Sequence, residues 1–154
     1  MKKAAIMMAT LMLLFLMGGC SSGQTKGIDI NQVANDLKNE ITYTDELSKL
    51  TDDMFDSVYK IDRSLVKQAI AYTSSGATAE EIVAIEMNQA EDVKTAETAL
   101  KDRIQYQKDG YSDYGPAEVP KLDNAVIKSS GTYIFMSVSD DHAKAEEILN
   151  RYLG

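Results

Sequence analysis

Residues 66–87 read VKQAIAYTSSGATAEEIVAIEM, and this stretch decides the fold class. Apolar and β-branched residues make up Val66–Thr73 and residues 82–87, whereas the segment between them is small and polar. Short β-branched runs on either side of such a loop are typical of a β-hairpin. Thr78 and Glu81 also match a helix capping box, but the run that follows is too short and too β-branched for a helix. The stretch therefore predicts two antiparallel strands.

The same order of elements is predicted again later in the chain. Residues 124–128 and 132–139 form a second pair of strand-like runs around a Ser-Ser-Gly turn. An amphipathic helix is predicted over residues 90–107, and Gly110 can end it. Asp140 can cap a last helix of the same kind. The chain thus reads as hairpin, helix, hairpin, helix.

This order predicts an α+β fold. Two ββα units, residues 65–109 and 124–153, are expected to join their hairpins into one four-stranded antiparallel sheet, with both helices covering one face. Residues 110–123 lack periodicity and are expected to cross the surface between the units. Ser-Ser-Gly occurs at Ser74 and again at Ser129, which is consistent with a duplication related by an approximate two-fold rotation. The same tripeptide is also common turn chemistry.

A helical arm, residues 29–62, is predicted to precede the sheet. Asp29 can cap a helix over residues 30–40, and Thr51 can cap a second, shorter helix. The first helix carries one apolar stripe, made of Ile30, Val33, Leu37 and Ile41. Residues 29–154 are therefore expected to form one domain.

The second face of the predicted sheet needs a cover. Strand alternation puts Tyr133 and Phe135 on the face away from the two long helices. Aromatic rings are unfavourable in water as an exposed patch. The arm is one candidate cover, and a partner protein, including a second copy of the chain, is the other.

Residues 1–19 have the layout of a secretory signal. Two lysines precede an apolar core over residues 4–17, which is shorter than the roughly 20 residues of a transmembrane helix. Small residues then precede Cys20, and this junction resembles the lipobox of bacterial lipoproteins, although Met17 stands where leucine is usual. In that motif the cysteine becomes the first residue and carries a diacylglycerol. Cys20 is the predicted lipidation site, because an ordinary signal would leave an unpaired thiol on a secreted protein.

The predicted mature protein is acidic. The whole chain of 154 residues has a net charge of -8, and removal of residues 1–19, with their two lysines, leaves about -10. Basic residues are interspersed with acidic ones throughout, whereas a nucleic-acid surface needs them clustered, so a nucleic-acid partner is not expected. Residues 20–28 are small and polar and predict a flexible tether between the lipid and the domain.

Three short motifs carry a resemblance to a known family. They are YTSSGATAEEI at residues 72–82, VPKLDNAV at 119–126 and VSDD at 138–141. With these motifs the chain resembles the DUF4358 family of lipoproteins from Gram-positive bacteria, over residues 29–153. The resemblance implies a surface lipoprotein and transfers no active site.

Few residues offer catalytic or metal-binding chemistry. The only histidine is His142, at the start of the last helix, and the only cysteine is the predicted lipidation site, so neither a nucleophile–base pair nor a zinc site is expected. Asp109 and Asp113 could ligate calcium, but no EF-hand loop surrounds them. The adjacent carboxylates are interpreted as helix caps and solvated faces: Asp52 and Asp53, Glu80 and Glu81, Asp140 and Asp141, Glu146 and Glu147. No cofactor is predicted.

Aromatic residues are the main candidates for a contact surface. Tyr106, Tyr111 and Tyr114 lie in a polar segment, where they could stack on sugar rings of cell-wall glycans or pack on their own domain. Tyr133, Phe135, Tyr111 and Tyr114 are therefore the candidate partner surface.

These features predict a non-catalytic binding or interaction module, held by lipid at the outer face of the cell membrane. Its expected partners are a protein or a cell-wall component, with self-association as an alternative. Two rival functions stay open: a carboxylate-dependent hydrolase of cell-wall polymers, and a small-ligand carrier for a membrane transporter. A deep cleft between two facing acids would favour the first, and a closed apolar pocket the second.

Overall fold

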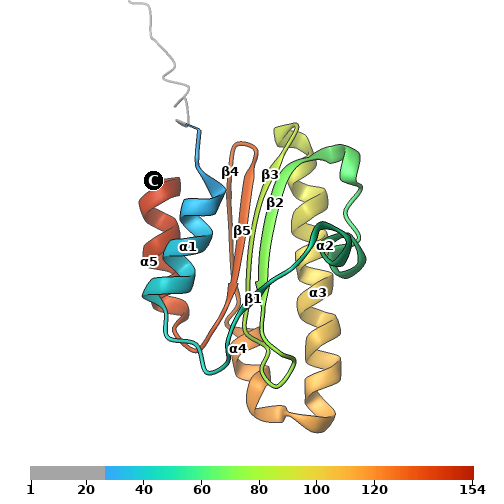
Figure 1. Ribbon diagram of the computed structural model, residues 1–154, viewed down its shortest axis with the longest axis vertical. Coiled ribbons are helices and arrows are strands. Elements are labelled where there is room, and N and C mark those ends of the chain that lie inside the picture. The colour runs from blue at the N-terminus through green and yellow to red at the C-terminus, as the bar shows by residue number, and fades with distance from the viewer. Residues whose placement is uncertain (1–26) are drawn as a thin grey trace, which may run out of the picture.

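The computed structural model describes residues 27–154. Its centre is an antiparallel sheet with the strand order β1-β2-β3-β5-β4, and helices cover both faces (Figure 1). The strands are β1 (Ser48–Lys49), β2 (Val66–Thr73), β3 (Glu81–Met87), β4 (Val126–Ser130) and β5 (Tyr133–Val138). The α+β class is confirmed.

Both predicted hairpins form, and they join through their inner strands. β2 pairs with β3, β4 pairs with β5, and the central pair β3–β5 aligns Glu81 with Val138 and Glu86 with Tyr133. The expected four strands are one too few, because β1 adds a short edge strand in which Ser48 pairs with Thr73. Two residues without an apolar pattern leave no periodic signal, and β1 is defined by its hydrogen bonds to β2.

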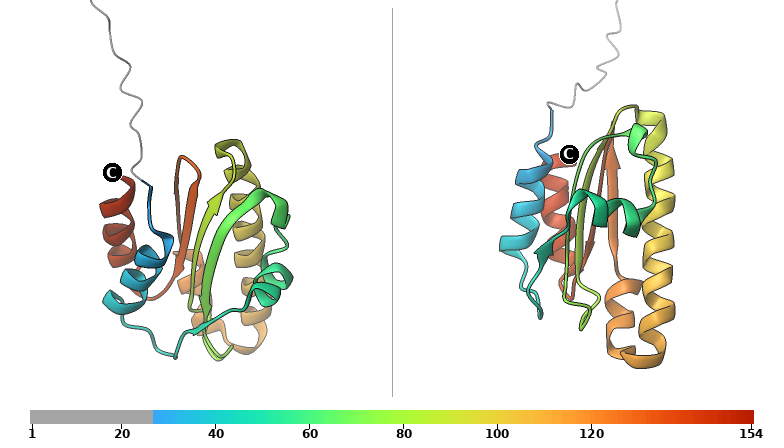
Figure 2. Two further views of the ribbon diagram at one scale, coloured as in Figure 1. Left: turned by 45° about the horizontal axis from the view of Figure 1, so that its top comes forward. Right: turned by 45° about the vertical axis from the view of Figure 1, so that its right-hand side comes forward.

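One face of the sheet is covered by the first and last helices of the domain. These are α1 (Ile30–Glu40), capped by Asp29, and α5 (His142–Leu153), which lie side by side in both views of Figure 2. The α5 cap is Asp141, whose side chain accepts from Lys144 N at 3.0 Å, and not Asp140 as expected. The stripe of α1 packs against the sheet, so of the two candidate covers the first helix of the arm is the one found, together with α5. The second helix of the arm lies on the opposite face.

The opposite face is covered by α2 (Asp52–Tyr59) and α3 (Val93–Tyr114). Their core residues include Phe55 and Leu100, which pack with the aliphatic side of β3 and β5. The expectation that both long helices share one face is therefore wrong, because α3 and α5 lie on opposite faces. The placement of α3 and α5 on opposite faces also rules out the expected two-fold relation. A two-fold rotation that exchanges the antiparallel neighbours β3 and β5 does not exchange the faces of the sheet, so it would place both helices on the same face.

The segment after α3 is more helical than expected. α3 continues through Gly110 to Tyr114, and short helices then cover Pro116–Glu118 (η3) and Val119–Asp123 (α4). Two further 3₁₀ turns, Arg63–Leu65 and Ala90–Asp92, lead into β2 and α3. Gly110 does not end the helix, because a glycine within a helix costs only about 1 kcal/mol and the added turn buries Tyr111.

The predicted signal and lipidation site lie outside the described residues. Cys20 belongs to residues 1–26, and the described chain begins at Gly27. Within residues 27–154, no helix combines the length and apolar character needed to cross a bilayer.

Candidate functional site

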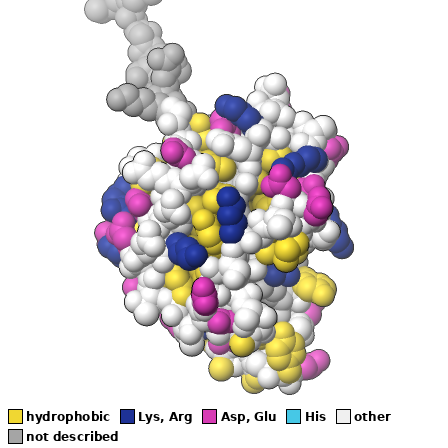
Figure 3. Space-filling view, viewed as in Figure 1, with side chains coloured by type: hydrophobic (Ala, Val, Ile, Leu, Met, Phe, Trp, Pro, Cys, Tyr) yellow, Lys and Arg dark blue, Asp and Glu magenta, His cyan; other side chains and the backbone are white. Residues whose placement is uncertain are grey.

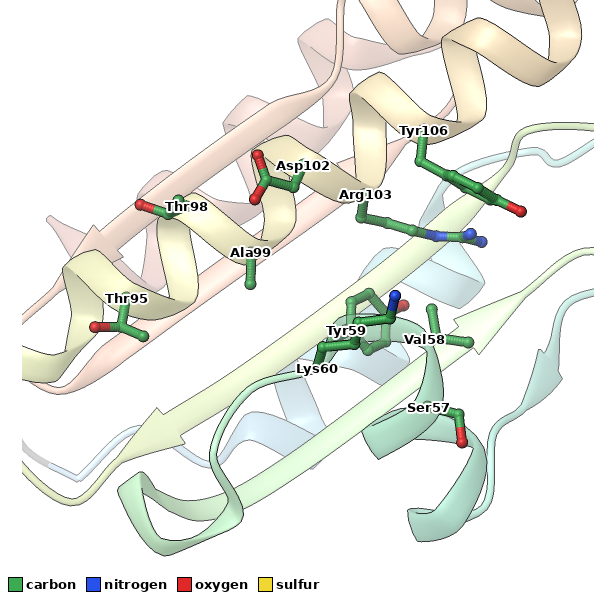
Figure 4. A pocket seen from close by; sticks show the side chains of 10 residues that line it. All are labelled: Ser57, Val58, Tyr59, Lys60, Thr95, Thr98, Ala99, Asp102, Arg103 and Tyr106. Atoms are coloured by element: carbon green, nitrogen blue, oxygen red, sulfur yellow. The ribbon is translucent and has the colours of Figure 1, made fainter.

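A groove runs along the side of α3 that adjoins α2 and the loop between β2 and β3. Its first hollow, of about 790 Å³, lies between α2 and the middle of α3 (Figure 4). It is lined by residues of both helices: Ser57, Val58, Tyr59, Lys60, Thr95, Thr98, Ala99, Asp102, Arg103 and Tyr106. The two helices thus form the walls of a recess that is open to solvent.

A second hollow, of about 620 Å³, continues the groove toward the end of α3. It lies between the second half of α3 and the loop that joins β2 to β3, and its lining includes Ser75, Thr78, Gln107 and Tyr114. Arg103 and Tyr106 line both hollows. We call the two hollows together the α3 groove, with these two side chains at its centre.

The polar floor of the groove is built on Glu81, the first residue of β3. The Glu81 carboxylate is fully buried and accepts from Arg103 Nη2 at 2.9 Å, from Arg103 Nε at 3.2 Å and from the Tyr59 hydroxyl at 2.7 Å. Gln107, one turn after Arg103, donates to the same carboxylate at 3.2 Å. Residues from β3, α2 and α3 thus meet at one buried charge.

The ion pair at this floor favours the charged form of Arg103. Burial disfavours the guanidinium, but the attraction of Glu81 outweighs burial and raises the pKa of Arg103 above its usual value. Burial, together with the Glu81 charge, raises the pKa of Tyr59 well above 10, so its hydroxyl stays protonated and donates. The floor is therefore electrically compensated and rigidly hydrogen-bonded.

Two polar groups at the floor retain unused hydrogen-bonding capacity. Arg103 spends Nε and Nη2 on Glu81, and Nη1 has no hydrogen-bond partner among residues 27–154. Its side chain is 17 % exposed and extends from α3 beside Tyr106 (Figure 4). Gln107 Oε1 is buried and likewise lacks a partner within the described part of the chain. Both groups belong to residues that line the second hollow.

The three tyrosines singled out from the sequence have different positions. Tyr106 and Tyr114 are 73 % and 70 % exposed, whereas Tyr111 is only 4 % exposed. The Tyr111 hydroxyl donates to the carbonyls of Gly76 and Thr78 in the β2–β3 loop, and burial raises its pKa to about 12. Tyr111 therefore fixes the loop to α3 and is not a surface residue.

Tyr133 and Phe135 are also not surface residues. Both rings are buried beneath α1 and α5, with their centroids 6.5 Å apart and their planes nearly parallel. The Tyr133 hydroxyl accepts from Ile28 N at 3.1 Å, where the chain enters α1. Their place in the candidate partner surface is wrong, because α1 and α5 already cover the face they lie on.

Glu80 and Glu81 are buried, contrary to the interpretation as solvated acids. Glu80 accepts from the backbone nitrogens of Thr44 and Asp45 at 2.8 and 2.9 Å, and Lys121 Nζ lies 3.4 Å away. The two neighbouring carboxylates point to opposite sides of the sheet, as strand alternation requires. They therefore do not face each other as an acid–base pair.

The remaining candidates stay at the surface or have other partners. Asp109 accepts from Gln105 Nε2 at 2.7 Å, and His142 is exposed at the first position of α5. Within the described residues, no three acidic or histidine side chains gather where they could hold a metal ion.

Sequence reasoning missed Arg103 and Gln107 as site residues. They lie four positions apart on α3 and extend the buried stripe of Ala96 and Leu100 with polar side chains. Polar residues that continue a core-facing stripe indicate a buried polar partner on the opposing strand. That signal was present, and Glu81 is the partner.

The comparisons with known proteins identify the family. The DUF4358 profile, described as a domain of unknown function, matches residues 39–139. No curated protein and no solved structure matches the chain. The match spans the whole sheet, α2, α3 and the Glu81 floor, and it leaves out most of α1 and all of α5. The chain therefore belongs to the DUF4358 family.

Proposed function

We propose that the protein is a lipid-anchored, extracytoplasmic binding module that holds a component of the cell envelope in the α3 groove. The observation that carries this proposal is the joining of two open hollows at Arg103 and Tyr106, above a compensated polar floor. Open recesses with a few fixed polar groups are typical of binding sites.

The anchor rests on the sequence before the domain. A signal-like segment ends at Cys20, and two acyl chains on that residue would give stable membrane attachment. Gly27 follows Cys20 by seven positions, so an extended tether reaches at most roughly 25 Å. The folded domain would therefore be held close to the membrane surface.

A binding role fits the groove better than hydrolysis. Glu81, the buried acid of the floor, is held by Arg103, Tyr59 and Gln107, and Glu80 is directed to the other side of the sheet. A carboxylate-dependent hydrolase instead needs two acids on either side of one bond. Both hollows are open to solvent, whereas a small-ligand carrier would enclose its ligand in an apolar pocket.

Occupancy of the groove can be tested by cysteine protection on cells. Thr98→Cys places a thiol in the first hollow, and Glu146→Cys places one on the exposed side of α5 as a matched control. Cys20 is the chain's one native cysteine and would be blocked by lipid. We expect an impermeant maleimide to label Thr98→Cys more slowly on intact cells than in the purified, detergent-solubilised protein. The proposal would be contradicted if the ratio of the labelling rate on cells to the rate in detergent were the same for Thr98→Cys and Glu146→Cys.

The anchor has a separate test. Cys20→Ala should release the protein into the medium or prevent its processing, because the lipid is lost. Immunoblots of membrane and medium fractions measure this directly. Mature-sized Cys20→Ala protein that stays in the membrane fraction would show that another segment holds it there.

A further inference from the structure

We propose that the ligand of the α3 groove is a neutral oligosaccharide, with Tyr106 and Tyr114 as the platforms on which sugar rings stack. This inference rests on the proposed binding role of the groove and names the chemical class of its ligand. Three independent observations support it: exposed aromatic rings, a lining without an excess of cations, and hydroxyl groups along that lining.

The exposed rings lie along the groove. Tyr106 and Tyr114 are, with Met54, the most exposed large hydrophobic residues of the described chain. Figure 3 shows hydrophobic side chains at the surface over α2 and the lower part of α3. Eight residues of α-helix separate the two tyrosines, which places them about 12 Å apart along the axis of α3. That separation exceeds one sugar ring and suits a ligand of several rings, because each ring has a flat apolar face.

The charged side chains of the lining nearly cancel, with two cations and three carboxylates. Lys60 and Asp102 line the first hollow together with Arg103, and Arg103 is already paired with Glu81. The second hollow adds the carboxylate of Asp109 and no further cation. An anionic ligand would have to compete with Glu81 for the guanidinium, and it would also meet the carboxylates of Asp102 and Asp109. A neutral ligand avoids both costs.

The polar lining matches sugar hydroxyls, which both donate and accept hydrogen bonds. Hydroxyl side chains line the groove: Ser57, Thr95 and Thr98 in the first hollow, and Ser74 and Ser75 in the second. Ser57, Thr98 and Ser74 donate to backbone carbonyls, so their oxygens remain as acceptors. Arg103 Nη1 offers an unused donor, and Gln107 Oε1 is a buried acceptor without a partner among residues 27–154. A sugar hydroxyl in the second hollow can accept from Arg103 Nη1.

The position of the groove favours an envelope glycan over a lipid headgroup. The described chain begins at one end of the molecule, next to the end of α5, whereas Tyr114 and the β2–β3 loop lie at the opposite end (Figures 1 and 2). A tether attached at Gly27 leaves the second hollow on the side away from the membrane.

Direct binding measurements test the saccharide class. The lipidated, full-length mature protein in detergent micelles is titrated by calorimetry with maltotriose, cellotriose and N-acetylated chitotriose, and with sodium phosphate as an anionic comparison. We expect at least one trisaccharide to bind and phosphate not to compete with it. Tyr106→Ala and Tyr114→Ala should each weaken that binding about tenfold, which corresponds to about 1.4 kcal/mol.

Two control variants keep the result interpretable. Met54→Ala removes another exposed large hydrophobic side chain, one that lies outside both hollows, and should leave the affinity within about twofold. Tyr106→Phe keeps the stacking ring and should retain most of the affinity. The inference is overturned if none of the three trisaccharides binds, if phosphate displaces them, or if the tyrosine variants bind like Met54→Ala. Protection of Thr98→Cys on cells without trisaccharide binding would reject the saccharide class and leave the binding role intact.

Discussion

Glu80 and Glu81 are neighbours in the sequence, both are fully buried, and their surroundings differ in kind. Glu80 is enclosed by the loop after α1 and by Lys121, a lysine that is itself buried and that also contacts Glu118 at 3.1 Å. Glu81 is equally buried, but its partner Arg103 is partly exposed and lines the α3 groove. One glutamate therefore fastens a loop, and the other supports a binding surface.

The difference teaches how a buried charge can be assigned to structure or to function. The Glu80 carboxylate is bonded entirely by groups of the protein that line no open hollow except Thr78: two backbone nitrogens, the Thr78 hydroxyl at 3.0 Å and the Lys121 ammonium. Around Glu81, Arg103 Nη1 and Gln107 Oε1 keep hydrogen-bonding capacity that no residue of the described chain uses. Spare capacity beside an open recess indicates a ligand, whereas complete satisfaction indicates a structural role.

The largest loss of stability is expected at Glu80. Glu80→Gln should lower the free energy of unfolding by about 3 kcal/mol. It removes the negative charge that faces the Lys121 ammonium, and it can place the amide NH₂ group of glutamine opposite backbone N–H groups, which are also donors. Urea denaturation measures the loss, and Glu146→Gln at an exposed position of α5 is the matched control. A Glu80→Gln protein as stable as the control would show that the loop does not depend on this charge.

Acid should weaken the same site through the same charge. Burial raises the pKa of Glu80, but the hydrogen bonds from Thr44 and Asp45 outweigh burial and hold it below the usual 4.5. The ionised Glu80 therefore stabilises the fold above pH 4.5, and this contribution is lost as the pH falls through the lowered value. We expect the stability difference between the wild type and Glu80→Gln to shrink below pH 4.5. A difference that is constant down to pH 3 would contradict this account.

The smallest loss of stability is expected at Glu81, beside the α3 groove. Glu81→Gln should cost about 1.5 kcal/mol, because Arg103 can turn into the groove and regain water as a partner. The same denaturation series measures it beside Glu80→Gln. A larger loss for Glu81→Gln than for Glu80→Gln would reverse the comparison and make Glu81 the structural residue of the two.

Much of the fold could be predicted from local signals. Asp29 and Thr51 cap α1 and α2 as expected, with side chains that accept from Asn31 N and Met54 N. The hairpin at residues 66–87 forms with its predicted strands. These elements depend on neighbouring residues, and their signals lie within a few positions of one another.

The placement of the helices on both faces was not predicted, although the strands carried a signal for it. β3 reads EIVAIEM and β5 reads YIFMSV, and every residue of both strands is buried. Such continuous burial, without a polar face, is typical of strands covered on both sides. An apolar stripe on a helix does not say which face of a sheet it will cover.

The candidate site was predicted only in part, because its components come from distant segments. The sequence indicated Tyr106 and Tyr114, whose exposure follows from the polar residues around them. The Glu81–Arg103 pair joins residues 22 positions apart, and its burial depends on α2 closing over both. The spacing of residues within one helix or strand does not predict such a contact.

The packing of α1 against α5 has a consequence for how the domain folds during synthesis. Arg151 contacts Glu40 at 2.5 Å and Tyr152 contacts Asp36, pairs that lie more than 100 positions apart in the chain. Tyr133 and Phe135 gain their full cover only when α5 has emerged and docked beside α1. The groove side can assemble earlier, since β2, β3 and α3 follow one another without interruption. The domain should therefore fold vectorially from its groove side, and a nascent chain that lacks α5 should still expose an aromatic face to chaperones.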